Sequence, residues 1–228
     1  MSGSFQIGHP PIEVNYKHNP RAKRMTLRIS NATGAVKMTL PGGVPVFKAQ
    51  EFAKSKEVWL RKHLAKRGPE RALTYGSTLL IDGEYRTITL GAKRAVTLDQ
   101  DRILTTYPED RLPHALAGYL KALARERFAQ ASGEYADALG LKFTKITMRD
   151  TTSRWGSCTT DGGLMFSWRL IMAPPHVQRY VAVHEVCHLR HMDHSKAFWD
   201  LVASIYPTYK TSEKWLKAHG SKLHQVRF

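Results

Sequence analysis

Five of the 11 histidines in this 228-residue chain fall between residues 176 and 194, at spacings typical of metal ligands. His184 and His188 are four residues apart, so on a helix their imidazoles lie one turn apart on the same face. Glu185 follows the first histidine directly and can reach a water molecule held by the same ion. The pattern His-Glu-x-x-His therefore predicts a metal site, and zinc is the expected ion.

The third ligand has two candidates. His194 lies six residues beyond His188, about 600° of helical rotation, so the chain must turn within residues 190–193 to bring it back. A new helix capped near Ser195 would then hold His194 at its beginning. His191 would be the ligand if the helix continued unbroken. A continuous helix, however, would leave the helix-start signal at Asp193-His194-Ser195 without an explanation. We expect His194 as the ligand, with His191 facing solvent or supporting a ligand.

The simplest alternative is a surface helix with ordinary histidines. The run Val181-Ala182-Val183 argues against it, because an apolar run predicts that this helix is buried. A buried Glu185 without a metal or a hydrogen-bonded cation would cost several kcal/mol. Three neutral imidazoles instead leave zinc a fourth position for a water molecule, which Glu185 would activate.

The elements that must position these residues lie in the second half of the chain. Apolar spacing and stop signals predict a long helix from Leu112 to Gly140 and strands at Phe143–Met148 and Leu164–Leu170. Pro174-Pro175 opens the histidine helix, a further helix runs from about Ser195 to Ile205, and a last short helix ends near Gly220.

The first half reads as mainly β. Its predicted elements are an antiparallel meander of Ile12–Tyr16, Met25–Ile29 and Val36–Leu40, a basic amphipathic helix over about 46–67, a hairpin of Leu79–Ile81 and Tyr85–Leu90 around Asp82-Gly83, and a strand pair of Ala95–Leu98 and Arg102–Tyr107. We therefore expect an α+β protein with two domains, a basic β-rich region over 1–110 and a second α+β domain over 111–228.

The charge is strongly positive, with 35 Lys and Arg against 19 Asp and Glu, a net charge of +16. Residues 1–70 hold 13 basic and 4 acidic side chains, so the excess is concentrated near the N-terminus. Such a surface attracts nucleic acid, nucleotides or acidic peptides. The alternative is a solvated basic surface without a specific ligand.

Nothing in the sequence predicts membrane insertion or secretion. No run approaches the 18 or so apolar residues that span a bilayer, and residues 1–11 lack the apolar core of a secretion signal. Two cysteines, Cys158 and Cys187, cannot build a disulfide framework. We therefore expect a cytoplasmic protein.

Two motifs together resemble a known family, the YgjP-like bacterial zinc metallopeptidases, which are related to the SprT and WLM zincins. The first runs from His184 to Leu189 and continues with Asp193-His194-Ser195-x-x-Phe198-Trp199, and the second is Arg154-Trp155-Gly156-Ser157-Cys158. The resemblance is strong from about Arg149 to Gly220 and looser over the rest of the chain.

The resemblance implies a zincin-like, minimal gluzincin-type metallopeptidase domain that acts on protein or peptide substrates. Carried onto this sequence, it makes His184, His188 and His194 the Zn²⁺ ligands and Glu185 the general base. Asp193 departs from the family, which usually has Asn there. The extra negative charge would either tighten metal binding or cap the following helix.

The remaining motif residues have structural readings as well. In the related zincins, a strand edge beside the active-site helix holds extended substrate. Arg154 would then bind a substrate carbonyl or phosphate, although a structural salt bridge explains it equally well. Cys158 could be an inhibitory zinc-binding thiol, whereas Cys187 reads as core. Phe198 and Trp199 are most simply the core of the supporting helix.

Two other functions are compatible with the same residues. A metal site beside Lys and Arg side chains is competent to hydrolyse phosphoanhydrides, as in a nucleotide hydrolase. A nucleic-acid-binding protein with a structural metal would explain the basic first third, and the SprT-like relatives act on proteins bound to DNA.

Overall fold

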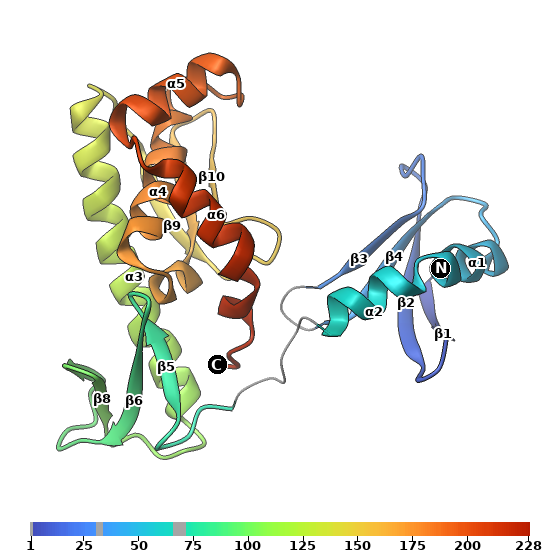
Figure 1. The fold of residues 1–228 in the computed structure, drawn as a ribbon, viewed down its shortest axis with the longest axis horizontal. Helices are drawn as coiled ribbons and strands as arrows, with labels where there is room; N and C mark the ends of the chain where they lie inside the picture. The colour runs from blue at the N-terminus through green and yellow to red at the C-terminus, as the bar shows by residue number, and fades with distance from the viewer. Residues whose placement is uncertain (1, 31–33, 66–71) are drawn as a thin grey trace. The chain divides into compact units, whose positions relative to one another are not determined.

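The computed structural model describes residues 2–30, 34–65 and 72–228, and its chain forms two compact units, 1–69 and 70–228. Both units combine sheets with helices (Figure 1), as the α+β expectation requires. None of the described helices is long and apolar enough to cross a membrane.

Unit 1, residues 1–69, is a four-stranded sheet covered by two helices. Its elements are β1 (Ser2–Ile7), β2 (Ile12–Asn19), β3 (Thr26–Ile29), β4 (Val36–Pro41), α1 (Val46–Ser55) and α2 (Glu57–Ala65). The strand order is β1-β2-β4-β3, and its core joins strand residues such as Val14 and Met38 to Ala49, Ala53 and Leu60 of the helices.

Three expectations for unit 1 need correction. The predicted meander fails because β2 pairs with β4 in parallel, and β3 returns antiparallel to β4 on the outside. Strand β1 was not predicted. The single helix expected over 46–67 is two helices, because Lys56 leaves helical geometry at φ −105° and ψ 8°. Residues 66 and 67 lie outside the described residues.

Unit 2, residues 70–228, contains two further sheets. The first has the order β5-β6-β8-β7, and the second has the order β10-β11-β9. The strands are β5 (Thr78–Ile81), β6 (Glu84–Leu90), β7 (Thr97–Asp99), β8 (Arg102–Thr105), β9 (Lys145–Arg149), β10 (Gly156–Cys158) and β11 (Gly163–Ser167). The predicted hairpin at Asp82-Gly83 is confirmed: both residues have positive φ, 55° and 83°, as a tight two-residue turn requires.

The helices of unit 2 pack against its sheets and against one another. They are α3 (Leu112–Ala138), the 3-10 helix η1 (Trp168–Met172), α4 (Pro175–Cys187), α5 (Lys196–Ile205), α6 (Tyr209–His219) and the 3-10 helix η2 (Gly220–His224). Figure 1 shows β5, β6 and β8 at the end of the unit where α3 begins, and α5 at the opposite end. The strand expected at Leu164–Leu170 stops at Ser167, and short strand β10 was not predicted.

The division between the units differs from the expected boundary at residue 110. Residues 70–110 belong to unit 2, because Leu79, Ile81 and Ile88 share one apolar core with α3 and α4. The tip of the Asp82 hairpin is also bonded to the segment before α4: the Asp82 amide donates to Ile171 O at 2.8 Å, and Gln178 Nε2 donates to the Asp82 carboxylate at 2.8 Å. This hairpin therefore holds the start of the histidine helix.

Candidate metal centre

Helix α4 positions the first two histidines. It begins after Pro174 with Pro175 in its first turn, where a missing amide hydrogen costs nothing. Val177, Val181 and Val186 are buried and fix the helix in the core of the unit. His184 and His188 follow on one face, and His188 is the last residue before the chain leaves the helix.

The predicted turn and second helix bring His194 back to that face. The chain turns after His188, and α5 begins at Lys196 with Ser195 as its N-cap, whose Oγ accepts the Phe198 amide at 3.5 Å. Asp193 steadies the turn, because its Oδ1 accepts the Ser195 amide at 3.1 Å. This contact is an Asx turn, and the helix itself is capped by Ser195, so the expected helix-capping role of Asp193 is wrong.

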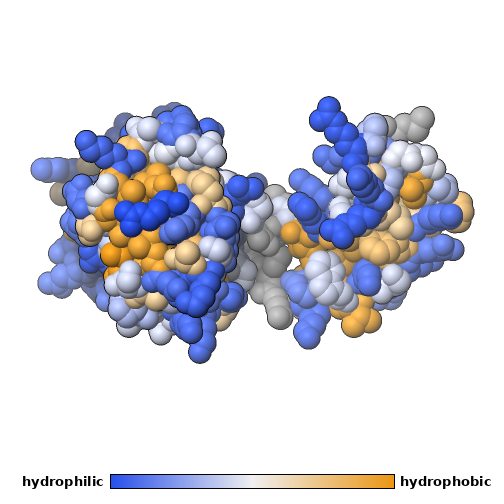
Figure 2. All heavy atoms as spheres, turned by 90° about the horizontal axis from the view of Figure 1, so that it is seen from above, coloured by the Kyte–Doolittle hydropathy of each residue, from blue (hydrophilic) through white to orange (hydrophobic). Residues whose placement is uncertain are grey.

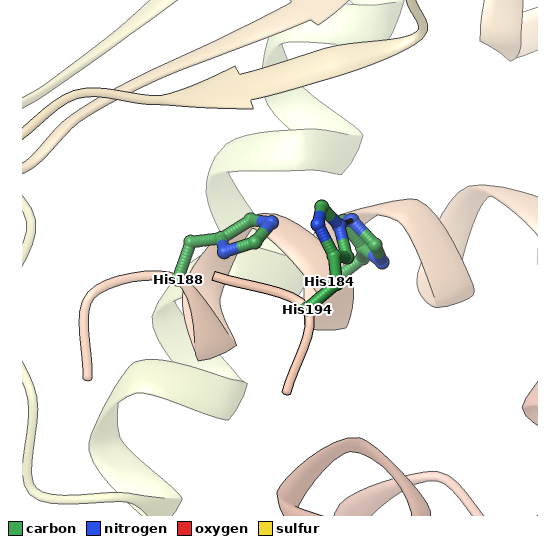
Figure 3. Close-up of side chains that lie close together, drawn as sticks. All are labelled: His184, His188 and His194. Carbon is green, nitrogen blue, oxygen red and sulfur yellow. Dashed lines mark hydrogen bonds between the residues drawn. The ribbon is translucent and has the colours of Figure 1, made fainter. Parts of the chain in front are cut away.

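The three imidazoles converge on one space, with a ligand nitrogen from each lying within 4.8 Å of the others (Figure 3). Nε2 of His194 is 3.0 Å from Nε2 of His184. Nδ1 of His188 is 2.8 Å from the carbonyl oxygen of His191. That carbonyl accepts a hydrogen bond, so Nδ1 carries the proton and Nε2 of His188 is free to bind a metal.

His191 takes part through its backbone, and its imidazole does not join the cluster in the described part of the chain. Cys158 lies in β10 at intermediate exposure, and its Sγ is not among the clustered ligand atoms either. Burial, with the charges of Glu185 and Asp161, raises the pKa of the Cys158 thiol to about 11. Cys187 is buried in the core, as expected.

One aromatic ring packs against all three imidazoles. The centroid of Phe198 lies 5.0 Å from that of His184, 4.4 Å from that of His188 and 4.9 Å from that of His194. Trp199 lies against His184 and His194 and stacks on Tyr209 of α6. Phe198 is fully buried, as expected of a core residue, and its ring also supports the three imidazoles from one side.

Two of the three histidines have pKa values lowered towards the neutral form that a metal ion requires. Burial, followed by the neighbouring His188 and His194, lowers the pKa of His184 to about 3. Burial also lowers the pKa of His188. Among the described residues, the buried Nδ1 of His184 has no hydrogen-bond partner. Neutral imidazoles are nitrogen donors of the kind that zinc prefers. The three residues therefore fit a zinc ion.

Glu185 lies beside the cluster and is only 5% exposed. Burial raises the pKa of its carboxyl to about 8, and the positive charge of Arg154 opposes that increase. Arg154 is exposed, on the segment leading into β10. The sequence motif around Arg154 is thus brought next to the general-base candidate.

Gly156 belongs to the family motif, but the sequence analysis did not predict its role. A Cβ built on Gly156 would lie 2.7 Å from both Cγ and Cδ of Glu185. The carboxyl of Glu185 therefore packs directly against the backbone of β10. A glycine at the start of a strand is a signal for such a close approach.

Arg169 holds the segment before Arg154 and was also missed. Its guanidinium is buried, donates to both carboxylate oxygens of Asp150 at 2.7 and 3.1 Å, and donates to the carbonyls of Leu223 and Val226. In the same region, the ring of His224 stacks on Trp155 at 5.0 Å. The sequence does contain a signal for this role, because Arg169 lies inside the apolar run 168–172. A charge buried with such a run needs partners in the fold.

Comparisons with known proteins place the chain in a family. No curated protein matches it. The metallopeptidase zymogen abylysin of Pyrococcus abyssi is a solved structure to which the chain is similar, with 19% identity and a TM-score of 0.36 over 38% of this chain and 89% of that chain. The YgjP-like metallopeptidase domain matches residues 23–219, and this chain therefore belongs to the YgjP-like metallopeptidase family.

Proposed function

We propose that this protein is a zinc-dependent peptidase in which His184, His188 and His194 hold the ion and Glu185 is the general base. The observation that carries the proposal is the convergence of three ligand nitrogens within 4.8 Å beside a buried carboxyl. Membership of a metallopeptidase family supports peptide substrates. When bound, zinc would supply Lewis acidity, polarising the peptide carbonyl and lowering the pKa of a water molecule.

Glu185 moves the proton. It accepts a proton from the attacking water as the new C–O bond forms, and it donates that proton to the amine nitrogen as the C–N bond breaks. A carboxyl serves both steps best when its pKa is near the working pH. Burial raises the pKa of Glu185 to about 8 in the metal-free protein, and the charge of a bound zinc ion would lower it from there. The close packing of Gly156 fixes the position of this carboxyl.

Strand β10 is our candidate for the substrate-binding edge. In its sheet, β10 pairs with β11 alone, and it lies at the sheet edge beside α4. An extended peptide could add to this edge through backbone hydrogen bonds. Arg154, exposed just before β10, would bind a carbonyl or carboxylate of that peptide.

The nucleotide-hydrolase alternative is less well supported. Phosphoryl transfer needs several cations around the phosphates. In the described part of the chain, Arg154 is the single cation whose charge shifts the pKa of Glu185. Nucleic acid remains a proposed partner of unit 1, whose residues 1–69 hold 13 basic and 3 acidic side chains.

The test compares zinc-loaded wild type with Glu185→Gln, using quenched fluorescent peptides and, in parallel, nucleoside triphosphates. We expect peptide cleavage by the wild type and a loss of about 10² to 10⁴-fold in the variant, with zinc content unchanged. Equal cleavage by Glu185→Gln would contradict the assignment of the base. Release of phosphate or pyrophosphate without peptide cleavage would contradict the peptidase.

A further inference from the structure

The sheet of unit 1 has one apolar face and one polar face. Along β2, Ile12 and Val14 are buried beneath α1 and α2, whereas Glu13, Asn15 and Lys17 are exposed on the opposite side. The same alternation places Lys37 of β4 on the open face. In the space-filling view, the visible side of unit 1 carries both hydrophilic and apolar side chains (Figure 2).

The open face carries a concentration of positive charge. Its exposed cations come from three strands and from the connection between β2 and β3; they are Lys17, Lys23, Arg24, Arg28 and Lys37, the sheet-face cluster. Lys23, Arg24 and Arg28 line an open hollow of about 560 Å³ together with Asn19, Thr26 and Thr39. Three of the five cations therefore line a recess that also holds hydrogen-bonding side chains.

Two cations of the cluster are direct neighbours. Arg28 of β3 and Lys37 of β4 are Cα partners in an antiparallel pair, so their side chains project from adjacent positions on one face. Like charges in directly opposed positions destabilise a sheet. The single ion pair found among the described residues of unit 1, Arg61 with Glu57, lies on α2. An external anion would offset the repulsion that the fold itself leaves in place.

The chemistry of the face suits a phosphate group. Phosphate oxygens are bound by Lys and Arg together with hydroxyl and amide side chains, and Asn15, Thr26 and Thr39 supply these between the cations. Single-stranded nucleic acid is bound on exposed aromatic rings. The described strand positions of the open face carry no Phe, Tyr or Trp; the rings of Phe5 and Tyr16 pack against the core instead.

We propose that the open face of the unit 1 sheet binds the phosphate backbone of double-stranded DNA without sequence preference. This inference concerns a surface outside the histidine cluster and does not depend on the proposed peptidase activity. If all five cations contact phosphates, the logarithm of the binding constant falls with the logarithm of salt concentration with a slope of about −4.5. Affinity then decreases about 500-fold between 50 and 200 mM salt.

The experiment measures fluorescence anisotropy of a labelled 24-base-pair DNA duplex with the full chain across a salt series. The test variant is Arg24→Gln/Arg28→Gln/Lys37→Gln. Its matched control is Lys48→Gln/Lys54→Gln/Lys62→Gln, which removes the same charge from α1 and α2. We expect the salt slope of the sheet-face variant to be about three units less negative than that of the wild type, and its affinity at 50 mM salt to be at least tenfold lower. The control variant should keep most of the wild-type slope and affinity. Circular dichroism verifies that both variants fold.

Equal losses in the two variants would overturn the proposal, because attraction would then follow net charge alone. Absence of duplex binding by the wild type at 50 mM salt would overturn it as well. Competition arms test the other polyanions: tighter binding of single-stranded DNA, double-stranded RNA or polyglutamate of equal charge would assign the face to that partner and contradict this inference.

Discussion

The carboxyl of Glu185 packs against Gly156 so closely that a Cβ on Gly156 would lie 2.7 Å from its Cγ and Cδ. Gly156 has no positive φ, so the constraint is the space itself and not the backbone conformation. We predict that Gly156→Ala displaces the carboxyl and lowers kcat for peptide cleavage at least tenfold, with zinc content unchanged. Ser157→Ala, at the next position of β10, is the control and should keep near-normal kcat. Full activity in Gly156→Ala would show that the carboxyl tolerates movement.

Ionisation of Glu185 should make the metal-free protein less stable at alkaline pH. Its pKa is raised from 4.5 to about 8 in the fold, so the protonated carboxyl is the form that the fold favours. The protonated carboxyl contributes its full share to the free energy of unfolding below pH 4.5, the pKa of the unfolded chain. This contribution is lost as the pH rises towards 8. We expect wild type to lose a few kcal/mol relative to Glu185→Gln over this range. Urea unfolding of both proteins in a chelator, from pH 5 to 9, measures the difference; a constant difference would contradict it.

Phe198 should control zinc affinity through the imidazoles it supports. Its ring lies within 5.0 Å of all three histidine rings, centroid to centroid. We predict that Phe198→Leu weakens zinc binding by about 10 to 100-fold, as loss of a supporting contact typically does. Val202→Ala, a buried change one turn further along α5, lowers unfolding free energy but leaves zinc affinity near wild type. Competition with a chromogenic chelator measures both, and equal affinities would refute the role of Phe198.

Arg169 should be needed for the stability of unit 2. Lysine keeps the charge but cannot reproduce the two-pronged contact with Asp150 or reach both backbone carbonyls. We predict that Arg169→Lys lowers the unfolding free energy by about 3 kcal/mol. Arg179→Lys changes an exposed ion pair with Glu134 and should cost less than about 1 kcal/mol. Denaturant unfolding compares the two, and similar losses would contradict the prediction.

The sequence predicted the local features of the site well. The four-residue spacing of His184 and His188, the turn after His188 and the Ser195 cap each depend on nearby residues, and each is present in the structure. The Asp82-Gly83 hairpin was also predicted from neighbouring residues. The pair Asp-Gly is typical of a two-residue turn in which both residues have positive φ.

Features that depend on distant contacts were not predictable in this way. The parallel pairing of β2 with β4 depends on tertiary contacts, and the apolar periodicity of a strand does not indicate its pairing partner. The domain boundary shifted because Leu79 and Ile81 pack with helices later in the chain. Apolar alternation from Leu164 to Leu170 looked like one strand, yet the chain bends into η1, where Arg169 reaches the C-terminal segment.

The central claim is that His184, His188 and His194 together bind one zinc ion, and elemental analysis of untagged protein tests it most directly. Wild type, His194→Ala and His191→Ala are each saturated with zinc and then desalted. We predict about one zinc per chain in wild type and in His191→Ala, because the His191 carbonyl that His188 contacts is backbone. We predict a sharp loss in His194→Ala. Equal zinc in His194→Ala and wild type, or no zinc in wild type, would contradict the three-histidine site.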